Sequence, residues 1–172
     1  MCVYIISHRL KTLSVNLPKH PLRINVGFLL NQPIGYSRDI HFDLPKIQFE
    51  EDFRVIDFTG TARVNRTPQG ILLLSDLQCA SPVNCVRCLA EFMQPLHSNF
   101  SELFAFNNRS TTESNLILPE DGSIDLEPLA REYLLLEVPI SPLCRPDCKG
   151  LCPVCGEDLN LMTCEHAAQA LM

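Results

Sequence analysis

Apolar and polar residues alternate through the middle of the chain with the period of two that is typical of β-strands. From Arg54 to Val64 the even positions are mainly apolar and the odd positions mainly polar. Thr67-Pro68-Gln69-Gly70 follows and fits a type I turn. A second alternating segment then places Ile71, Leu73, Leu77 and Cys79 on one face. Because successive side chains of a strand point to opposite faces, the two segments predict a β-hairpin with one buried face.

The same alternation predicts two further strands. Residues 36–44 place apolar side chains on one side, and we expect this strand to end at Pro45. Residues 92–106 alternate phenylalanine and leucine with polar residues, which predicts a strand with a bulge near Pro95. Residues 22–30 fit either a strand or a short helix.

A helix is predicted at about residues 125–137, after a polar segment, 107–120, that indicates a loop. Its leucines recur with helical spacing, Asp125 suits the N-cap position, and Pro128 is tolerated in the first turn. The expected fold class is therefore α+β: a mainly antiparallel β-sheet with one packed helix and a C-terminal tail rich in cysteine. We expect three parts, namely a poorly ordered leader (1–21), a β-rich core (22–140) and a Cys-rich, zinc-binding tail packed on the core (141–172).

Composition supports a protein with a real core that stays out of the membrane. The chain has 172 residues, of which 46% are hydrophobic, and a chain of this length can bury about 70% of its unfolded surface. Its longest apolar runs are too short to cross a bilayer, and its start lacks the features of a signal peptide. These features predict a cytoplasmic protein with no membrane partner.

Cysteine spacing gives the strongest chemical signal. Five of the nine cysteines lie between Cys144 and Cys164, closely followed by His166, and another pair forms Cys85-x-x-Cys88. Soft ligands packed this densely are typical of a metal site. An odd cysteine count without a signal peptide argues against a secreted disulfide framework. Cys79 falls on the apolar face of its strand, so we expect it to be a core thiol.

Eight candidate ligands suffice for two tetrahedral sites. Pairing neighbouring couples gives a first site of Cys85, Cys88, Cys144 and Cys148, and a second of Cys152, Cys155, Cys164 and His166. Both would be closed, structural zinc sites, because catalytic zinc usually keeps an open position. The alternatives are a single zinc with the remaining thiols free, an iron–sulfur cluster, or no metal at all.

Charge argues against broad, sequence-independent RNA binding. The formal net charge is −6, and seven thiolates with two Zn²⁺ would take it to about −9. A local phosphate-binding patch could still form from Arg87, Arg145 and Lys149, which lie beside the ligands. No nucleotide-binding loop or catalytic triad is recognised. A dithiol oxidoreductase would need Cys85-x-x-Cys88 between a strand and a helix, whereas a strand is predicted after it.

Three blocks together resemble a known family. They are Cys85-Val86-Arg87-Cys88-Leu89-Ala90-Glu91-Phe92, Ile124-Asp125-Leu126-Glu127-Pro128 with the leucine-rich helix, and Cys148-Lys149-Gly150-Leu151-Cys152-Pro153-Val154-Cys155-Gly156-Glu157-Asp158-Leu159-Asn160. In order and spacing, over roughly residues 22–166, they resemble the YceD-like proteins, the large ribosomal RNA subunit accumulation proteins of bacteria and chloroplasts. The chain departs from the family at His166, where many members carry cysteine.

The resemblance implies a role in the synthesis, processing or stability of large-subunit (23S) rRNA, and it does not imply a known enzymatic activity. The expectation is therefore a non-enzymatic ribosome-biogenesis factor without a small-molecule substrate. It would act on rRNA or a pre-ribosomal particle, directly or through a protein partner. A protein-interaction adaptor that affects rRNA only indirectly is the alternative that the acidic charge favours, and a dithiol oxidoreductase is the third.

Overall fold

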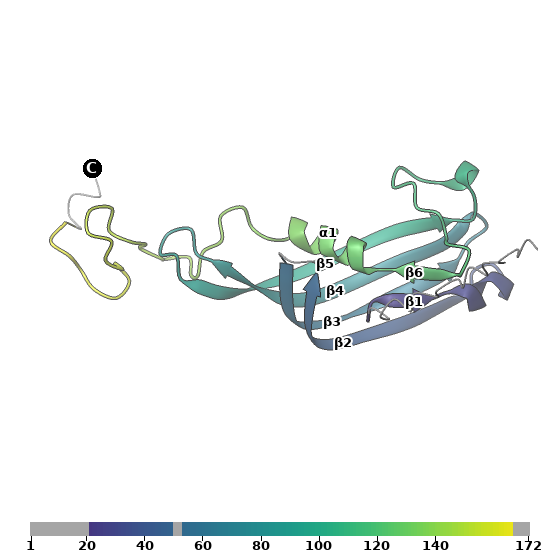
Figure 1. Ribbon diagram of the computed structural model, residues 1–172, viewed down its shortest axis with the longest axis horizontal. Helices are drawn as coiled ribbons and strands as arrows, with labels where there is room; N and C mark the ends of the chain where they lie inside the picture. Colours follow the sequence, from purple (N-terminus) through teal and green to yellow (C-terminus); the bar gives the residue numbers. More distant parts are fainter. Residues whose placement is uncertain (1–20, 50–52, 167–172) are drawn as a thin grey trace, which may run out of the picture.

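One antiparallel sheet forms the body of the protein. The computed structural model describes residues 21–49 and 53–166. The four-stranded sheet has the order β2-β3-β4-β5, formed by β2 (Ser37–Phe49), β3 (Phe53–Arg66), β4 (Gly70–Asn84) and β5 (Glu91–Ala105) (Figure 1). A two-stranded sheet pairs β1 (Arg23–Asn25) with β6 (Ser123–Asp125), and one α-helix follows, α1 (Glu127–Leu136). The predicted α+β class, with a mainly antiparallel sheet and one helix, is confirmed.

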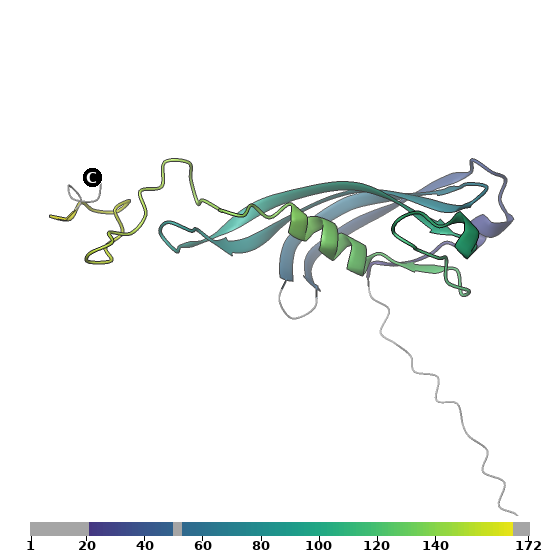
Figure 2. The ribbon, with the colours of Figure 1, turned by 90° about the horizontal axis from the view of Figure 1, so that it is seen from above.

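The small sheet and α1 lie against one face of the large sheet (Figures 1 and 2). Buried side chains from both layers make a single cluster that includes Leu22, Ile24, Ile124, Leu126 and Leu134 on one side and Phe58, Val64, Leu73, Leu77 and Phe100 on the other. The opposite face of the sheet carries polar cross-strand pairs such as Arg63–Asp39, at 2.6 Å. The alternation in the sequence therefore separates a buried face from a polar one.

A bulge in β3 moves the alternation by one residue. Phe53 and Val55 are buried before it, and Phe58 is buried after it, whereas Ile56 is only partly buried. The register with β4 shifts between Ile56 and Thr59, and Asp57 has a φ of 51°. An extra residue on one strand turns the following side chains to the other face. The bulge predicted near Pro95 is wrong, because β5 stays in register with β4 there.

Proline does not end β2, so the predicted end at Pro45 is wrong. The strand continues to Phe49, with Lys46 paired to Ile56 of β3. β2 is an edge strand of the four-stranded sheet. On such a strand, a proline whose missing N–H would point away from the sheet removes no ladder hydrogen bond.

The other local predictions were partly right. Residues 22–30 contain both a strand, β1, and a 3-10 helix, η1 (Gly27–Asn31). The predicted loop holds a short 3-10 helix, η2 (Asn108–Ser110), and an isolated β-bridge from Ile117 to Ala105. The α-helix starts at Glu127, and Asp125 accepts a hydrogen bond from the Glu127 N–H at 3.0 Å without being the N-cap residue. The predicted leader lies outside the described residues except for Pro21.

β4 and β5 extend beyond the rest of the sheet as a two-stranded arm. The last pair between β3 and β4 is Ile56–Ala80, but β4 and β5 remain paired as far as Asn84–Glu91. We call residues 81–94 the arm. Pro82 is compatible with it because β4 has no pairing with β3 at this point. The arm carries the turn of Cys85 and Cys88 away from the core, toward the C-terminal tail (Figure 1).

Tyr133 and Glu102 attach α1 to the sheet. The Tyr133 ring stacks on Phe100 with 4.1 Å between centroids, and its hydroxyl donates to Glu102 Oε1 at 2.6 Å. Ser114 donates to the other carboxylate oxygen at 2.6 Å. The hydrogen bond to Glu102, together with burial, raises the pKa of Tyr133 to about 12. The neutral phenol is therefore the form that holds the helix in place.

Tyr133→Phe is expected to lower the free energy of unfolding by about 1–2 kcal/mol, because a hydrogen bond to a charged group is lost while the ring still stacks. In the native chain this contribution is present below the ordinary pKa of 10.0 and is lost as the pH rises through about 12. Urea denaturation at neutral and alkaline pH measures both effects. Tyr36→Phe is the control, since that exposed hydroxyl has no hydrogen-bond partner among the described residues; equal losses in the two variants would contradict the assignment.

Candidate metal centres

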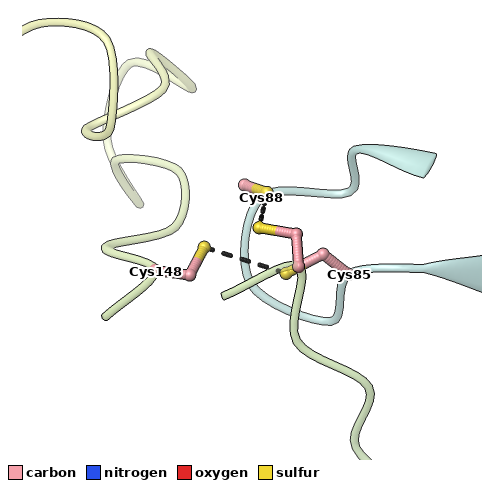
Figure 3. Close-up of side chains that lie close together, drawn as sticks. Cys85, Cys88 and Cys148 are labelled. Carbon is pink, nitrogen blue, oxygen red and sulfur yellow. Dashed lines mark hydrogen bonds between the residues drawn. The ribbon is translucent and has the colours of Figure 1, made fainter. Parts of the chain in front are cut away.

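Four thiols meet where the arm contacts the tail. Cys85 and Cys88 lie on the turn at the tip of the arm, which is closed by Leu89 N–H donating to the Cys85 carbonyl at 2.9 Å. Cys144 and Cys148 come from the segment after α1. The N–H of Val86 donates to the carbonyl of Pro142 at 3.0 Å, which keeps that segment beside the arm. Figure 3 shows Cys148 pointing from the tail toward Cys85. We call Cys85, Cys88, Cys144 and Cys148 the first cluster.

The sulfur spacing in the first cluster suits a single tetrahedral ion. Cys85 Sγ lies 3.7 Å from Cys148 Sγ, and Cys88 Sγ lies 3.6 Å from Cys144 Sγ. With metal–sulfur bonds of about 2.3 Å, the edges of a tetrahedral thiolate site are about 3.8 Å long. The cysteines of the described residues are all free thiols. Geometry therefore fits a metal ion between the arm and the tail.

A second cluster forms within the tail from Cys152, Cys155, Cys164 and His166, whose potential ligand atoms lie within 4.8 Å of one another. The Cys152–Cys155 turn is closed by Gly156 N–H, which donates to the Cys152 carbonyl at 2.9 Å. Gly156 has a φ of 76°, a conformation that glycine adopts easily. His166 Nδ1 is buried and has no hydrogen-bond partner among the described residues. A buried nitrogen without a partner fits a ligand position.

In both clusters, hydrogen bonds and burial shift the pKa values of neighbouring thiols in opposite directions. In the first, the backbone N–H of Cys144, followed by that of Cys88, lowers the pKa of Cys85 to about 6. Burial, followed by the neighbouring Cys88, raises the pKa of Cys144 to about 12. In the second cluster the N–H groups of Cys155 and Val154 lower the pKa of Cys152 to about 7. Burial and then Cys152 raise the pKa of Cys164. Without a cation, one thiolate discourages ionisation of the others, whereas a divalent ion would favour them all.

Direct contacts also fasten the tail to the arm. The Arg87 guanidinium donates to the Cys148 carbonyl at 2.7 Å, and the Arg87 carbonyl accepts from Leu151 N–H at 3.1 Å. Gly150, with a φ of 78°, packs against the same residue, and a Cβ there would lie 3.0 Å from the Arg87 carbonyl oxygen. Arg87 and Gly150 therefore both help to hold the tail on the arm.

The residues predicted to form a phosphate patch have different surroundings. Arg87 makes the structural contact with Cys148, and Arg145 Nε lies 3.5 Å from Asp147 Oδ1. Lys149 is exposed, and its backbone N–H donates to Asn160 Oδ1 at 2.8 Å. Phosphate binding by these three residues stays a prediction.

Sequence reasoning missed Asn160 as a part of the site. Its side-chain amide donates to Cys148 Sγ at 3.5 Å, so a residue from the loop of the second cluster contacts a thiol of the first. In the sequence, Asn160 lies between the Cys152–Cys155 pair and Cys164, at the end of the third block that resembles the family. Asparagine is so common in loops that this place alone does not indicate a contact with sulfur.

A family model described as large ribosomal RNA subunit accumulation protein YceD matches residues 75–171. This stretch starts within β4 and includes the arm, α1 and both clusters. The resemblance in the sequence had been expected from about residue 22, so the matched part begins later in the chain. No solved structure matches the chain significantly.

Curated relatives match parts of the chain. An uncharacterized protein of Mycobacterium tuberculosis is 36% identical over 101 residues, which are 56% of this chain and 49% of the relative. An uncharacterized protein of Bacillus subtilis is 31% identical over 81 residues, 46% of this chain and 47% of the relative. Over 40 residues, the chain is 42% identical to the maize chloroplastic large ribosomal RNA subunit accumulation protein YCED homolog 1, covering 23% of this chain and 14% of that protein. The match thus spans about half the length of the mycobacterial and Bacillus relatives.

The described part of the chain offers no way to cross a bilayer as a helix. Neither α1 nor the 3-10 helices within residues 21–49 and 53–166 have the length and apolar character that a membrane span requires.

Gly150→Ala is expected to loosen the tail on the arm, because the new Cβ presses against Arg87 in addition to the cost of a positive φ. Gly156→Ala is a matched control, since it has a similar φ but no atom within 4 Å of its Cβ position. Hydrogen exchange at the Leu151 amide, which bonds to Arg87, measures the contact directly. Exchange should accelerate at least several-fold in Gly150→Ala and change little in Gly156→Ala; similar exchange in both variants would argue against close packing at Gly150.

Proposed function

The chain belongs to the YceD family of large ribosomal RNA subunit accumulation proteins, and from this premise we propose that it is a cytoplasmic, non-enzymatic factor that supports the synthesis, processing or stability of large-subunit (23S) rRNA. The observation that carries the proposal is the family match over residues 75–171, which includes the whole arm and the helix. A ribosome-biogenesis role agrees with the name of the maize chloroplastic relative.

Both clusters are proposed to hold zinc. Each offers four ligand atoms of the sulfur and nitrogen type that zinc prefers, within 4.8 Å of one another. A site with four protein ligands leaves no position for a reacting water, so such ions serve structure. This closed ligand set supports a binding factor in preference to a hydrolase.

Zinc would take the place of a hydrophobic core in the tail. Among residues 141–166 the only buried side chains are Cys148 and Cys152. Exposed apolar side chains there include Val154, Leu161 and Met162. Burial of apolar surface therefore contributes little to the tail, whereas zinc binding in small peptides contributes about 10–16 kcal/mol. The proposed ions would hold the tail rigidly at the end of the arm as one binding surface.

A protein-interaction adaptor that acts on rRNA indirectly is the second candidate. The formal net charge of −6 opposes binding to a polyanion through general electrostatics. Exposed Val86 and Leu89 at the arm tip add to the apolar side chains of the tail, and such side chains suit a protein partner.

The purified full chain is expected to contain two zinc ions per molecule by elemental mass spectrometry. Cys88→Ser should lose the ion of the first cluster and Cys155→Ser the ion of the second, each leaving about one per chain. Cys79→Ser is the matched control: this thiol is buried in the core, where burial raises its pKa to about 11, and it is outside both clusters. Full zinc content in Cys88→Ser, or a loss in Cys79→Ser equal to that in Cys88→Ser, would contradict the ligand assignment.

Depletion of the protein in its host cell is expected to lower mature large-subunit rRNA relative to small-subunit rRNA, with recovery on re-expression of the native chain. Quantitative RNA sequencing measures the ratio, and an unchanged ratio would refute the role. Ultraviolet crosslinking of the strain that re-expresses the native chain then separates the two candidates. Large-subunit rRNA fragments joined to the chain support direct binding, and recovery of protein partners alone supports the adaptor.

A further inference from the structure

The two clusters share one short segment of the backbone. Cys148 belongs to the first and Cys152 to the second, and the residues between them pair with the loop that follows Cys155. Leu159 N–H donates to the Gly150 carbonyl at 2.9 Å, and Cys152 N–H donates to the Glu157 carbonyl at 2.8 Å. Backbone hydrogen bonds therefore join this loop to the segment that carries Cys148.

The Asn160 side chain completes this pairing, and its orientation is fixed on both sides. Oδ1 accepts from Lys149 N–H at 2.8 Å, while Nδ2 donates to Asp158 Oδ1 at 2.6 Å. Rotating the amide by 180° would set its NH₂ group against a backbone N–H and its oxygen against a carboxylate. Nδ2 must therefore face Cys148 Sγ, from which it lies 3.5 Å away.

From this geometry we propose that Asn160 is a positioning residue that couples the two metal centres. Its N–H stabilises the Cys148 thiolate of the first cluster. An N–H···S contact of this kind favours the thiolate that binds a metal ion. Its place depends on the second cluster, because the loop from Cys155 to Cys164 that contains Asn160 is closed when both cysteines bind the same ion.

The coupling predicts that a metal ion in either cluster raises the metal affinity of the other. Filling the second cluster holds the Asn160 loop closed and raises the metal affinity of the first. By thermodynamic linkage, filling the first cluster raises the affinity of the second by the same factor. The tail would then be held on the arm most firmly when both ions are present.

This inference rests on the proposed zinc occupancy, and the experiment separates the two. Native full chain and the variants Asn160→Ala and Asn160→Asp are loaded with Zn²⁺ and titrated with a chromophoric chelator. Co²⁺ spectra distinguish the four-sulfur site from the site with one nitrogen. Leu161→Ala is the matched control, since Leu161 is adjacent, 83% exposed and outside both clusters. Far-UV circular dichroism confirms that the sheet of each variant is folded.

Asn160→Ala is expected to weaken binding at the first cluster by about tenfold or more, the usual effect of losing a group that supports a metal ligand. Asn160→Asp should weaken it further, because a carboxylate oxygen then faces the thiolate. Leu161→Ala should match the native chain. A native chain that binds no metal would overturn both the zinc proposal and this inference. Two bound ions with native affinity in Asn160→Ala would overturn the inference alone.

A double-mutant cycle tests whether coupling passes through Asn160. Cys155→Ser, which removes the second site, should weaken the first site about as much as Asn160→Ala does. Added to Asn160→Ala, it should cause little further loss. If Cys155→Ser lowers the metal affinity of the first site equally in the native chain and in Asn160→Ala, the coupling bypasses Asn160 and the proposal is overturned.

Discussion

The meeting of four sulfur atoms from two distant parts of the chain decides where the tail lies. Cys85 and Cys148 are 63 positions apart, yet their sulfurs lie 3.7 Å from each other. Thiols that are buried together disfavour one another's ionisation, and a bound cation would reverse the sign of that interaction. The contacts from Arg87 to Cys148 and Leu151 also hold the tail along one side of the turn. The first cluster is thus both a chemical site and the joint between the sheet and the tail.

The shape of the sheet prepares this joint. β3 stops pairing with β4 at Ile56–Ala80, so the end of the β4–β5 hairpin projects alone and presents its turn away from the core. The bulge at Asp57 lies just before this point and turns the side chains of β3. On the buried face of the sheet, the hydrogen bond between Tyr133 and Glu102 fixes α1 (Figure 2). The chain then leaves α1 toward the arm. The projecting hairpin and the chain that follows α1 therefore meet at the first cluster.

Much of the fold was present in the sequence as periodicity. Alternation predicted the buried faces of β3 and β4 and the hairpin between them, and leucine spacing predicted α1, because these signals depend on residues that are near neighbours along the chain. The errors have a common cause. Whether Pro45 ends a strand depends on the strand being at an edge, and whether Val55 or Ile56 is buried depends on a bulge set by pairing with β4. The first depends on the place of β2 in the sheet, and the second on the register between β3 and β4.

For the candidate site, the sequence alone determined the kind of chemistry. Its cysteine and histidine spacing indicated soft-metal ligands, and its order of blocks indicated the family. Only the tertiary structure decided that the arm and the tail contact each other through Arg87 and Gly150, and that Asn160 faces Cys148. The physical reason is separation along the chain. Ligand spacing involves residues that are close together in the sequence. The effect of a hydrogen bond to sulfur or of a missing Cβ depends on the residue that folding places opposite it.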